Sequence, residues 1–304
     1  MFLTIKNENY GYAVTTYGDY VVVAKPAFTR YSTVSSSLFQ TGSLDYYRYN
    51  KTTDQHDLIG QLYRNPSEMN ILLAGETGSV PGQKSPLHTE DGNTGESADK
   101  DIEIDKNNYT ASLEDGIGLS IDMYSKLLVA GSPYFSQSVE TSASLFTTSG
   151  SVVNVFDLSL SEFTLSPTTS LFAYEIENPD LQVTESFGMS VSINSGWLAV
   201  GSPYVSGSNG MVYIYRNTST GSNYSWALAQ KIVATDVISG SRFGHSLKLN
   251  KQSGSYSGSL IVGCGNLLTN KAFYFQYISG SWTQTSIFNS DLETEYPLTF
   301  GDFD

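Results

Sequence analysis

Residues 187–216 read FGMSVSINSGWLAVGSPYVSGSNGMVYIYR, and this stretch decides the fold of the chain. An aromatic residue and a glycine open one short alternating run, and Gly-Ser-Pro closes the next, so that Gly188 and Pro203 are 15 positions apart. A bracket of this kind that recurs at tens of residues predicts a repeat architecture. Two further copies keep the 15-position spacing, Gly11 to Pro26 and Gly118 to Pro133, and a looser copy extends over 21 positions, from Gly244 to Gly265.

Two more alternating runs follow each bracket. Their Val, Ile, Tyr and Phe residues alternate with polar ones between turns of Gly, Asn and Ser, which is typical of strands. The third runs are 42–50, 150–158, 210–217 and 271–277, and the fourth runs are 56–64, 162–169, 225–233 and 281–288. Four short strands per repeat form an antiparallel sheet that buries both faces only by stacking on its neighbours. We therefore predict an all-β fold, a β-propeller of four or five four-stranded antiparallel blades.

The prediction places a single β-propeller domain over residues 1–304, without a helix of more than two turns. Its readable repeats cover about residues 10–65, 116–175, 186–234 and 242–289. Residues 66–115 are either a degenerate blade or an insertion, because MNILLAGETG imitates a second strand and DIEIDKN an outer one. Near the end of the chain, Phe300-Gly301 is typical of the start of another first strand.

The bracket residues have structural roles in this prediction. The first strand of a blade lies at the crowded centre, where glycine permits close approach of neighbouring backbones. The aromatic residue before that glycine fills the wedge between blades. Proline donates no backbone hydrogen bond, so it ends the second strand.

These motifs resemble FG-GAP repeats, the blades of integrin α-subunit propellers. The resemblance covers the four readable repeats and implies a propeller with a ligand- or partner-binding face. It rests on Phe187-Gly188 with Gly201-Ser202-Pro203, Gly118 with Gly131-Ser132-Pro133, Phe243-Gly244 with Gly263-Cys264-Gly265, and the looser Tyr10-Gly11 with Ala24-Lys25-Pro26.

The calcium loops of that family are missing from the corresponding positions. Calcium-binding FG-GAP blades carry several acidic residues between the first and second strands, because calcium prefers oxygen ligands. Here those loops read TYGDY, DMYSK, INSGW and LNKQSGSYSGS, and the longest has no acidic residue. We therefore expect no metal there and no cofactor. A weak candidate cluster remains, which is otherwise a solvated loop: Asp91, Asn93, Glu96, Asp99 and Asp101.

Catalytic signals are lacking in the sequence. His56, His88 and His245 stand in different parts of the chain and do not supply the three or four ligands of a zinc site. There is no nucleophile elbow and no glycine loop that would cradle a phosphate. We predict that the protein is not an enzyme. Cys264, the single cysteine, is expected to be a small buried hydrophobic residue.

Charge and hydropathy exclude two kinds of partner. The chain has a net charge of −14 and only 15% charged residues, whereas a nucleic-acid groove needs clustered Lys and Arg. No apolar run approaches the length that spans a membrane, so membrane insertion is not expected. The N-terminal residues lack the basic and apolar regions of a secretory signal.

Aromatic residues that follow the second strands are the candidates for a binding face. Two long connections, 26–43 and 133–151, combine aromatic residues with Ser, Thr and Gly, a composition that is typical of interfaces. The candidate contact residues are Tyr31, Tyr134, Phe135 and Tyr204. For the three tyrosines, the alternative is an ordinary exposed side chain.

Two classes of function fit these observations. The first is a non-catalytic structural or binding module, in its most specific form a virion component of a bacteriophage tail or capsid surface. It would mediate protein assembly or host-surface attachment, and its partners would be other virion proteins, a host receptor or a glycan. A viral protein assembled inside the host needs no secretory signal, and docking on a symmetric particle gains strength from multivalency. The alternative is a secreted or cell-surface propeller that binds or degrades glycans, with an extracellular location.

Overall fold

The computed structural model describes residues 9–26, 29–32, 37–62, 113–134, 137–141, 144–148, 151–159, 172–180, 186–194, 196–220, 225–250, 258–265 and 271–289. Strands make up most of these residues, and the α-helix among them, α2 (Val205–Ser208), has four residues. The expectation that no helix exceeds two turns is confirmed for this part of the chain.

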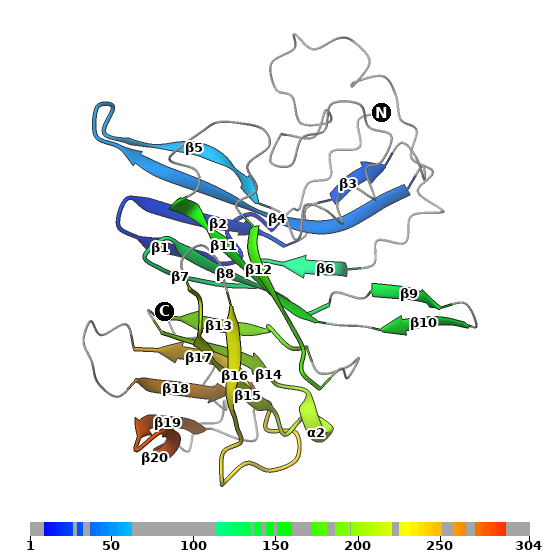
Figure 1. The fold of residues 1–304 in the computed structure, drawn as a ribbon, viewed down its shortest axis with the longest axis vertical. Helices are drawn as coiled ribbons and strands as arrows, with labels where there is room; N and C mark the ends of the chain where they lie inside the picture. The colour runs from blue at the N-terminus through cyan, green and yellow to red at the C-terminus, as the bar shows by residue number, and fades with distance from the viewer. Residues whose placement is uncertain are drawn as a thin grey trace, which may run out of the picture.

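Four antiparallel four-stranded sheets form the body of the protein (Figure 1). The first contains β1 (Val14–Tyr17), β2 (Tyr20–Lys25), β4 (Ser37–Asn50) and β5 (Gln55–Leu62), and the second contains β7 (Ser120–Tyr124), β8 (Leu127–Ser132), β11 (Val152–Asp157) and β12 (Phe172–Glu177). The third contains β13 (Ser190–Ile193), β14 (Trp197–Ser202), β15 (Met211–Asn217) and β16 (Trp226–Ile232), and the fourth contains β17 (Phe243–Leu249), β18 (Ser259–Cys264), β19 (Lys271–Ile278) and β20 (Ser281–Asn289).

Within each sheet, the strands pair with their neighbours in chain order, as predicted. The sheets also follow one another in chain order, from the blue strands to the red ones in Figure 1. The first strand of each sheet lies beside the first strand of the next: β1 beside β7, β7 beside β13, and β13 beside β17. This is the arrangement of propeller blades, and the predicted all-β fold is confirmed.

Smaller elements extend the first sheet and form a separate hairpin. The long strand β4 also pairs with β3 (Thr29–Ser32) and, in parallel, with β6 (Leu113–Ile117). A separate hairpin consists of β9 (Gln137–Thr141) and β10 (Ser144–Thr148). Residues 63–112 and 290–304 lie outside the described residues, so a fifth blade and a strand at Phe300-Gly301 stay predictions.

One predicted strand was wrong. The outer strand of the second sheet is β12, in which Tyr174 pairs with Val155, and not the run 162–169. In the sequence FAYEIE of β12, large hydrophobic residues alternate with Ala173 and two glutamates. The predicted run contains Pro167, which cannot donate to a strand ladder. The sequence pattern favoured the run 162–169 because this run follows the third strand more closely than β12 does.

Every repeat opens with the same turn. The residue two positions before the bracket glycine has a positive φ, and its carbonyl accepts a hydrogen bond from the amide three residues later, at 3.1–3.2 Å. In the first three repeats the glycine amide then donates to the second strand of its own sheet, as Gly188 does to the Gly201 carbonyl at 3.1 Å. The turn residues are Asn9, Gly116, Ser186 and Arg242.

Glycines bring the backbones of successive sheets into direct contact. A Cβ atom on Gly131 would lie 1.9 Å from the carbonyl oxygen of Gly188, and a Cβ atom on Gly201 would lie 2.0 Å from that of Gly244. The glycine of Gly-Ser-Pro in one blade therefore faces the aromatic-glycine pair of the next. Gly188 and Gly244 both have φ +87°, a conformation that side chains disfavour. Close backbone approach, predicted for these glycines, is confirmed.

A serine hydroxyl reinforces each of two such contacts. Ser120 Oγ donates to the Gly188 carbonyl and Ser190 Oγ to the Gly244 carbonyl, both at 2.7 Å. Each serine stands two positions after the bracket glycine of its own repeat, so the donor comes from one blade and the acceptor from the next. Between the first and second sheets Ala13 and Ala24 replace the serine and the glycine, and a Cβ on Gly118 would lie 2.8 Å from Ala24 Cβ.

A buried carboxylate joins three first strands. Asp122 on β7 accepts hydrogen bonds from Ser192 Oγ at 2.6 Å and from the Ile193 amide at 3.0 Å, and its other oxygen lies 3.3 Å from Lys248 Nζ. Ser192 Oγ in turn accepts from the Leu249 amide at 3.1 Å. Three blades thus converge on one hydrogen-bonded carboxylate, which is how a buried charge is tolerated.

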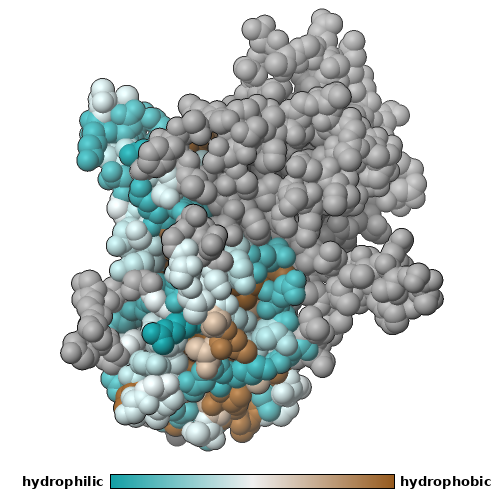
Figure 2. Space-filling model, viewed as in Figure 1, coloured by the Kyte–Doolittle hydropathy of each residue, from teal (hydrophilic) through white to brown (hydrophobic). Residues whose placement is uncertain are grey.

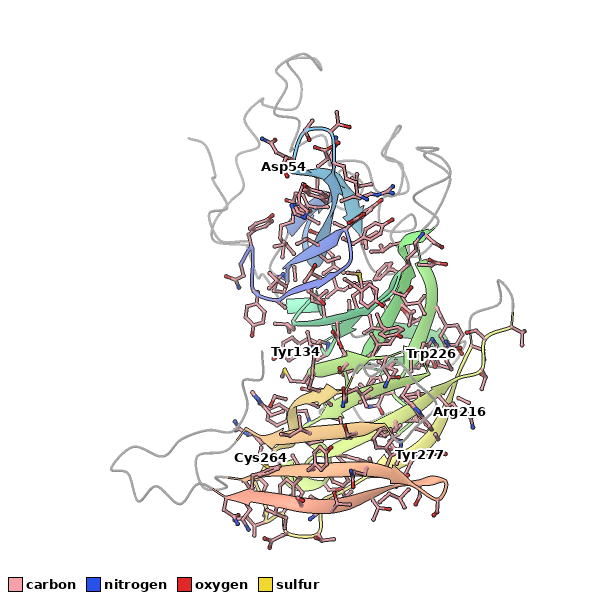
Figure 3. The ribbon with its side chains drawn as sticks, turned by 90° about the vertical axis from the view of Figure 1, so that its left-hand side faces the viewer. Asp54, Tyr134, Arg216, Trp226, Cys264 and Tyr277 are labelled. Atoms are coloured by element: carbon pink, nitrogen blue, oxygen red, sulfur yellow. The ribbon has the colours of Figure 1, made fainter. Side chains whose placement is uncertain are left out.

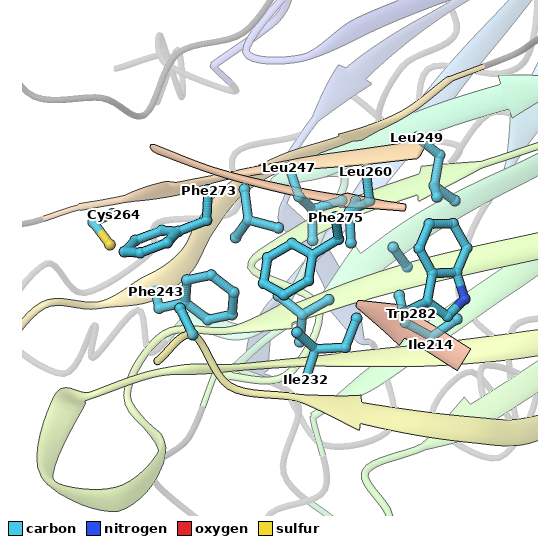
Figure 4. Packing of buried hydrophobic residues seen from close by; sticks show 14 residues of the cluster. Ile214, Ile232, Phe243, Leu247, Leu249, Leu260, Cys264, Phe273, Phe275 and Trp282 are labelled. Atoms are coloured by element: carbon cyan, nitrogen blue, oxygen red, sulfur yellow. The ribbon is translucent and has the colours of Figure 1, made fainter. Parts of the chain in front are cut away.

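Hydrophobic clusters fill the space between successive sheets. Phe187 and Phe243 are fully buried, one between the second and third sheets and the other between the third and fourth. The ring of Phe243 packs edge-on against Phe273, with the centroids 5.5 Å apart (Figure 4). Cys264 belongs to the same cluster, and burial raises the pKa of its thiol to about 12. The wedge role of the two phenylalanines and the buried state of Cys264 are confirmed.

Substitution of the interface glycine tests this packing. Gly201→Ala places a methyl group against the Gly244 carbonyl, so we expect it to lower the free energy of unfolding by about 2–3 kcal/mol. Gly196→Ala on the same sheet is the control, because nothing lies within 4 Å of a Cβ there and φ is not positive; its effect should stay within about 0.5 kcal/mol. Urea unfolding measures both, and equal effects would contradict the contact.

Candidate functional site

Aromatic side chains gather at the edge where the second strands end. Tyr134 and Tyr204 each stand two residues after the last residue of a second strand, β8 and β14. Because first and second strands are antiparallel, the start of β1, with Tyr12 just before it, lies at the same edge. Figure 3 shows Tyr134 on the side of the sheets that carries Cys264, opposite Arg216, Trp226 and Tyr277.

The three tyrosines belong to three consecutive sheets, and two of them influence the third. The pKa of Tyr134 is raised above its ordinary value of 10.0, first by partial burial and then by the neighbouring hydroxyls of Tyr204 and Tyr12. Tyr134 keeps 40% of its surface exposed and Tyr12 keeps 58%, while Tyr204 is half-buried. The edge therefore presents phenol rings that are partly fixed and partly accessible.

The fourth sheet contributes an arginine to the same edge. Arg242 occupies the turn before β17, and its guanidinium lies 5.2 Å from the centre of the Tyr204 ring, a cation–π distance. Backbone hydrogen bonds fix this turn, from the Arg242 amide to the Ser208 carbonyl and from the His245 amide to the Arg242 carbonyl. We call the set Tyr12, Tyr134, Tyr204 and Arg242, with one residue from each sheet, the tyrosine edge.

Local backbone structure positions the two central tyrosines. A Cβ atom on Gly116 would lie 3.2 Å from the Tyr134 ring, so glycine there lets the ring lie against the backbone before β7. Tyr204 precedes α2, whose residues Ser206 and Gly207 have positive φ values of 52° and 72°. The chain reverses within this turn, and the Gly210 amide donates to the Val205 carbonyl at 3.2 Å.

The structure brings together two of the four predicted contact residues, Tyr134 and Tyr204. Tyr31 lies on β3, where its backbone pairs with Leu38, but its side chain is outside the described part, as is all of Phe135. The sequence analysis missed Tyr12 and Arg242. Tyr12 follows the bracket glycine Gly11, and Arg242 stands two positions before the bracket glycine Gly244. Their positions relative to these glycines are the sequence feature from which both residues could have been predicted.

Other features offer less to a ligand. The predicted acidic cluster, Asp91, Asn93, Glu96, Asp99 and Asp101, lies outside the described residues. Within the described ranges, no group of three or more His, Cys, Asp and Glu residues could hold a metal ion. His245 is half-buried, with its ring beside Gly265.

A shallow cleft of 390 Å³ lies at the hairpin tips of the first sheet. Three of its lining residues are already hydrogen-bonded, since Asn50 Nδ2 donates to Asp57 at 2.7 Å and the Tyr49 hydroxyl donates to Asp54 in the same hairpin. Exposed hydrophobic side chains on and after β16, among them Leu228, Val233 and Ile238, are separated by polar ones, and Figure 2 shows only small brown patches on this face. The tyrosine edge differs from both features, because all four sheets contribute residues to it.

Comparison with known proteins adds no functional assignment. No family model matches the chain, and no curated protein does. A solved structure, that of Sqt1 from Saccharomyces cerevisiae, is similar at 9% sequence identity and a TM-score of 0.26 over 93% of this chain and 86% of that one. Membership in the FG-GAP family stays a prediction. In the described part of the chain, no helix is long and apolar enough to cross a membrane.

The proximity of the tyrosines can be measured by titration. Tyr204→Phe removes a hydroxyl whose ionisation disfavours ionisation of Tyr134, so the pKa of Tyr134 should fall toward 10.0 without reaching it, because burial remains. NMR titration of the tyrosine ring carbons measures this value. Tyr17→Phe, at the opposite end of β1, is the control and should leave the pKa of Tyr134 unchanged. If the pKa of Tyr134 is unchanged in Tyr204→Phe, the two hydroxyls do not interact, and the proximity of the rings is contradicted.

Proposed function

We propose that the protein is a non-catalytic binding module that docks on a protein partner through the tyrosine edge. The observation that carries this proposal is the convergence of Tyr12, Tyr134, Tyr204 and Arg242 from four consecutive sheets at one edge. Tyrosine and arginine dominate the energetics of protein interfaces, because they combine large contact area with hydrogen-bonding groups.

The sheets supply rigidity to this surface. Tyr134 and Tyr204 directly follow strands whose last residues, Ser132 and Ser202, are fully buried, so the rings start from fixed backbone. A contact residue that is already ordered loses little conformational freedom on binding, which favours affinity. The cation–π contact between Arg242 and Tyr204 further restrains both side chains before any partner arrives.

In its most specific form, the proposal makes the protein a component of a virus particle, at a phage tail or capsid surface. An edge that presents one contact residue per repeat suits attachment to a repeated surface, where several weak contacts gain strength through multivalency. The blades are held together by backbone contacts and buried clusters, and the single cysteine lies in one of these clusters. Assembly of this body therefore needs no disulfide.

Truncation of an exposed ring tests the binding surface. Tyr134→Ala should weaken partner binding at least about tenfold, as loss of an interface anchor does, while the melting temperature stays nearly unchanged. Co-sedimentation with particles from the native source, followed by quantitative blotting, measures the attachment. Tyr17→Ala is the matched control, because Tyr17 is 39% exposed against 40% for Tyr134 but lies at the opposite edge.

Three results would contradict the proposal. Equal loss of attachment in both variants would show that the edge has no special role. If Tyr134→Ala unfolds at a clearly lower temperature, this ring is part of the core. The reference for such a loss is Tyr213→Ala, because Tyr213 is fully buried and its truncation should cost about 3–5 kcal/mol of stability. A protein that never associates with particles, but binds oligosaccharides through Tyr134, would replace the virion proposal with a glycan-binding function.

A further inference from the structure

Arg242 has a backbone conformation that the other repeats give to small residues. Its φ is 54°, in the left-handed region that glycine and, to a lesser degree, asparagine adopt without strain. The equivalent turn positions of the other three repeats hold Asn9, Gly116 and Ser186. Strained residues concentrate at binding sites, so a long charged side chain at this turn points to a role beyond the fold.

The guanidinium of Arg242 lacks an anionic partner in the described part of the chain. Four lysines there are neutralised by aspartates, in the pairs Lys25 with Asp45, Lys231 with Asp180, Lys248 with Asp122 and Lys271 with Asp236. Arg242 forms no such pair and lies over the ring of Tyr204 instead, at 5.2 Å. A guanidinium that stacks on a ring keeps the N–H donors at its rim available to a ligand.

The tyrosine edge adds hydroxyl groups beside this cation. Tyr204 lies against the guanidinium, and the hydroxyls of Tyr204 and Tyr12 lie close enough to that of Tyr134 to raise its pKa. Within the described residues, none of the three hydroxyls forms a hydrogen bond. Each of them can donate one hydrogen bond. A fixed arginine beside free hydroxyl donors suits a carboxylate, which accepts charge-assisted hydrogen bonds through both oxygens.

The charge at this edge favours a single carboxylate over a more highly charged group. Phosphate groups and nucleic acids are bound by clusters of Arg and Lys. Lys25, the last residue of β2 at the same edge, is already neutralised by Asp45 at 3.0 Å. The net charge of −14 also opposes the approach of a polyanion. An aspartate or glutamate side chain carries the one charge that Arg242 can neutralise.

We infer that the protein partner presents an aspartate or glutamate to the tyrosine edge, where Arg242 binds its carboxylate and the tyrosines contact the segment that carries it. The inference rests on the proposed function, because it names the chemistry of the partner at that same edge. Arg216 is not an equivalent site, although its guanidinium lies 5.8 Å from the centre of the Trp197 ring. It is exposed on the regular strand β15 and lies on the side of the sheets opposite Tyr134 (Figure 3).

Titration of the full-length protein with short peptides tests the inference directly. Acetyl-tetraglutamate amide should shift the NMR signals of the Arg242 Nε–H group and of the Tyr134 and Tyr204 rings in a saturable way, with a Kd in the millimolar range. Acetyl-tetraglutamine amide has nearly the same size but no charge, so it should bind at least about tenfold more weakly. The ring signals of Tyr17, at the opposite edge, should not move with either peptide.

Substitutions of Arg242 separate its charge from its place in the turn. Arg242→Asn introduces a residue that tolerates the positive φ, so the melting temperature should be unchanged or higher, while tetraglutamate binding weakens at least about tenfold. Arg242→Lys keeps the charge and should retain part of the binding. Arg216→Asn is the matched control, because it removes an arginine that also lies over an aromatic ring, and it should leave tetraglutamate binding unchanged.

The inference is overturned by any of three titration results. Equal binding of the two peptides would show that the carboxylate has no role. A clearly lower melting temperature of Arg242→Asn would make the arginine a residue of the fold. If inorganic phosphate or N-acetylneuraminic acid binds more tightly than tetraglutamate, and Arg242→Asn abolishes this binding, the anion is a phosphate group or an acidic sugar.

Attachment to particles from the native source distinguishes failure of this inference from failure of the proposed function. If Tyr134→Ala loses attachment and Arg242→Asn does not, the edge binds a partner without a carboxylate, and only the inference falls. If neither variant loses attachment, the proposed function falls as well. Loss of attachment in Arg242→Asn, with partial recovery in Arg242→Lys and none of the loss in Arg216→Asn, is the result that the inference predicts.

Discussion

Backbone contact between glycines of successive sheets is the constraint on which the rest of the structure depends. At Gly131 and Gly201, the carbonyl oxygen of the next repeat occupies the place of a side chain, so the second strand of one sheet and the start of the next sheet approach as closely as backbones can. The serines at 120 and 190 then reach across the boundary and donate to those carbonyls. With the spacing fixed in this way, Phe187 and Phe243 fill the wedge that opens between the sheets, and Asp122 can bond to two neighbouring first strands at once.

The same constraint produces the proposed binding surface. Each repeat places the end of its second strand and the turn before its first strand at one edge, because these two strands are antiparallel. Residues just outside the bracket therefore come from all four sheets and meet there, as Tyr134, Tyr204 and Arg242 do. Their identity is free to vary, since the fold depends on the bracket residues and not on the residues beside them. The repeat thus separates residues that hold the blades together from residues that contact a partner.

The sequence predicted the fold better than the site. Spacing between glycine and proline located the first two strands of three blades, and the looser pair Gly244 and Gly265 located those of the fourth. It failed for β12, where a run with Pro167 had a similar pattern to a strand. Tyr134 and Tyr204 were found because they follow proline, but Tyr12 and Arg242 were not. Their role depends on which sheet edges coincide in space, and Arg242 acquires its partner only through the packing of α2 against the turn before β17.

The central claim is that serine and glycine join one blade to the next, and the position of Ser190 in a crystal structure tests it most directly. The account predicts that Ser190 Oγ lies at hydrogen-bond distance, 2.7 Å, from the Gly244 carbonyl oxygen, with no atom between that oxygen and Gly201. A separation beyond about 3.5 Å, or a side chain or water molecule between the two backbones, would contradict it.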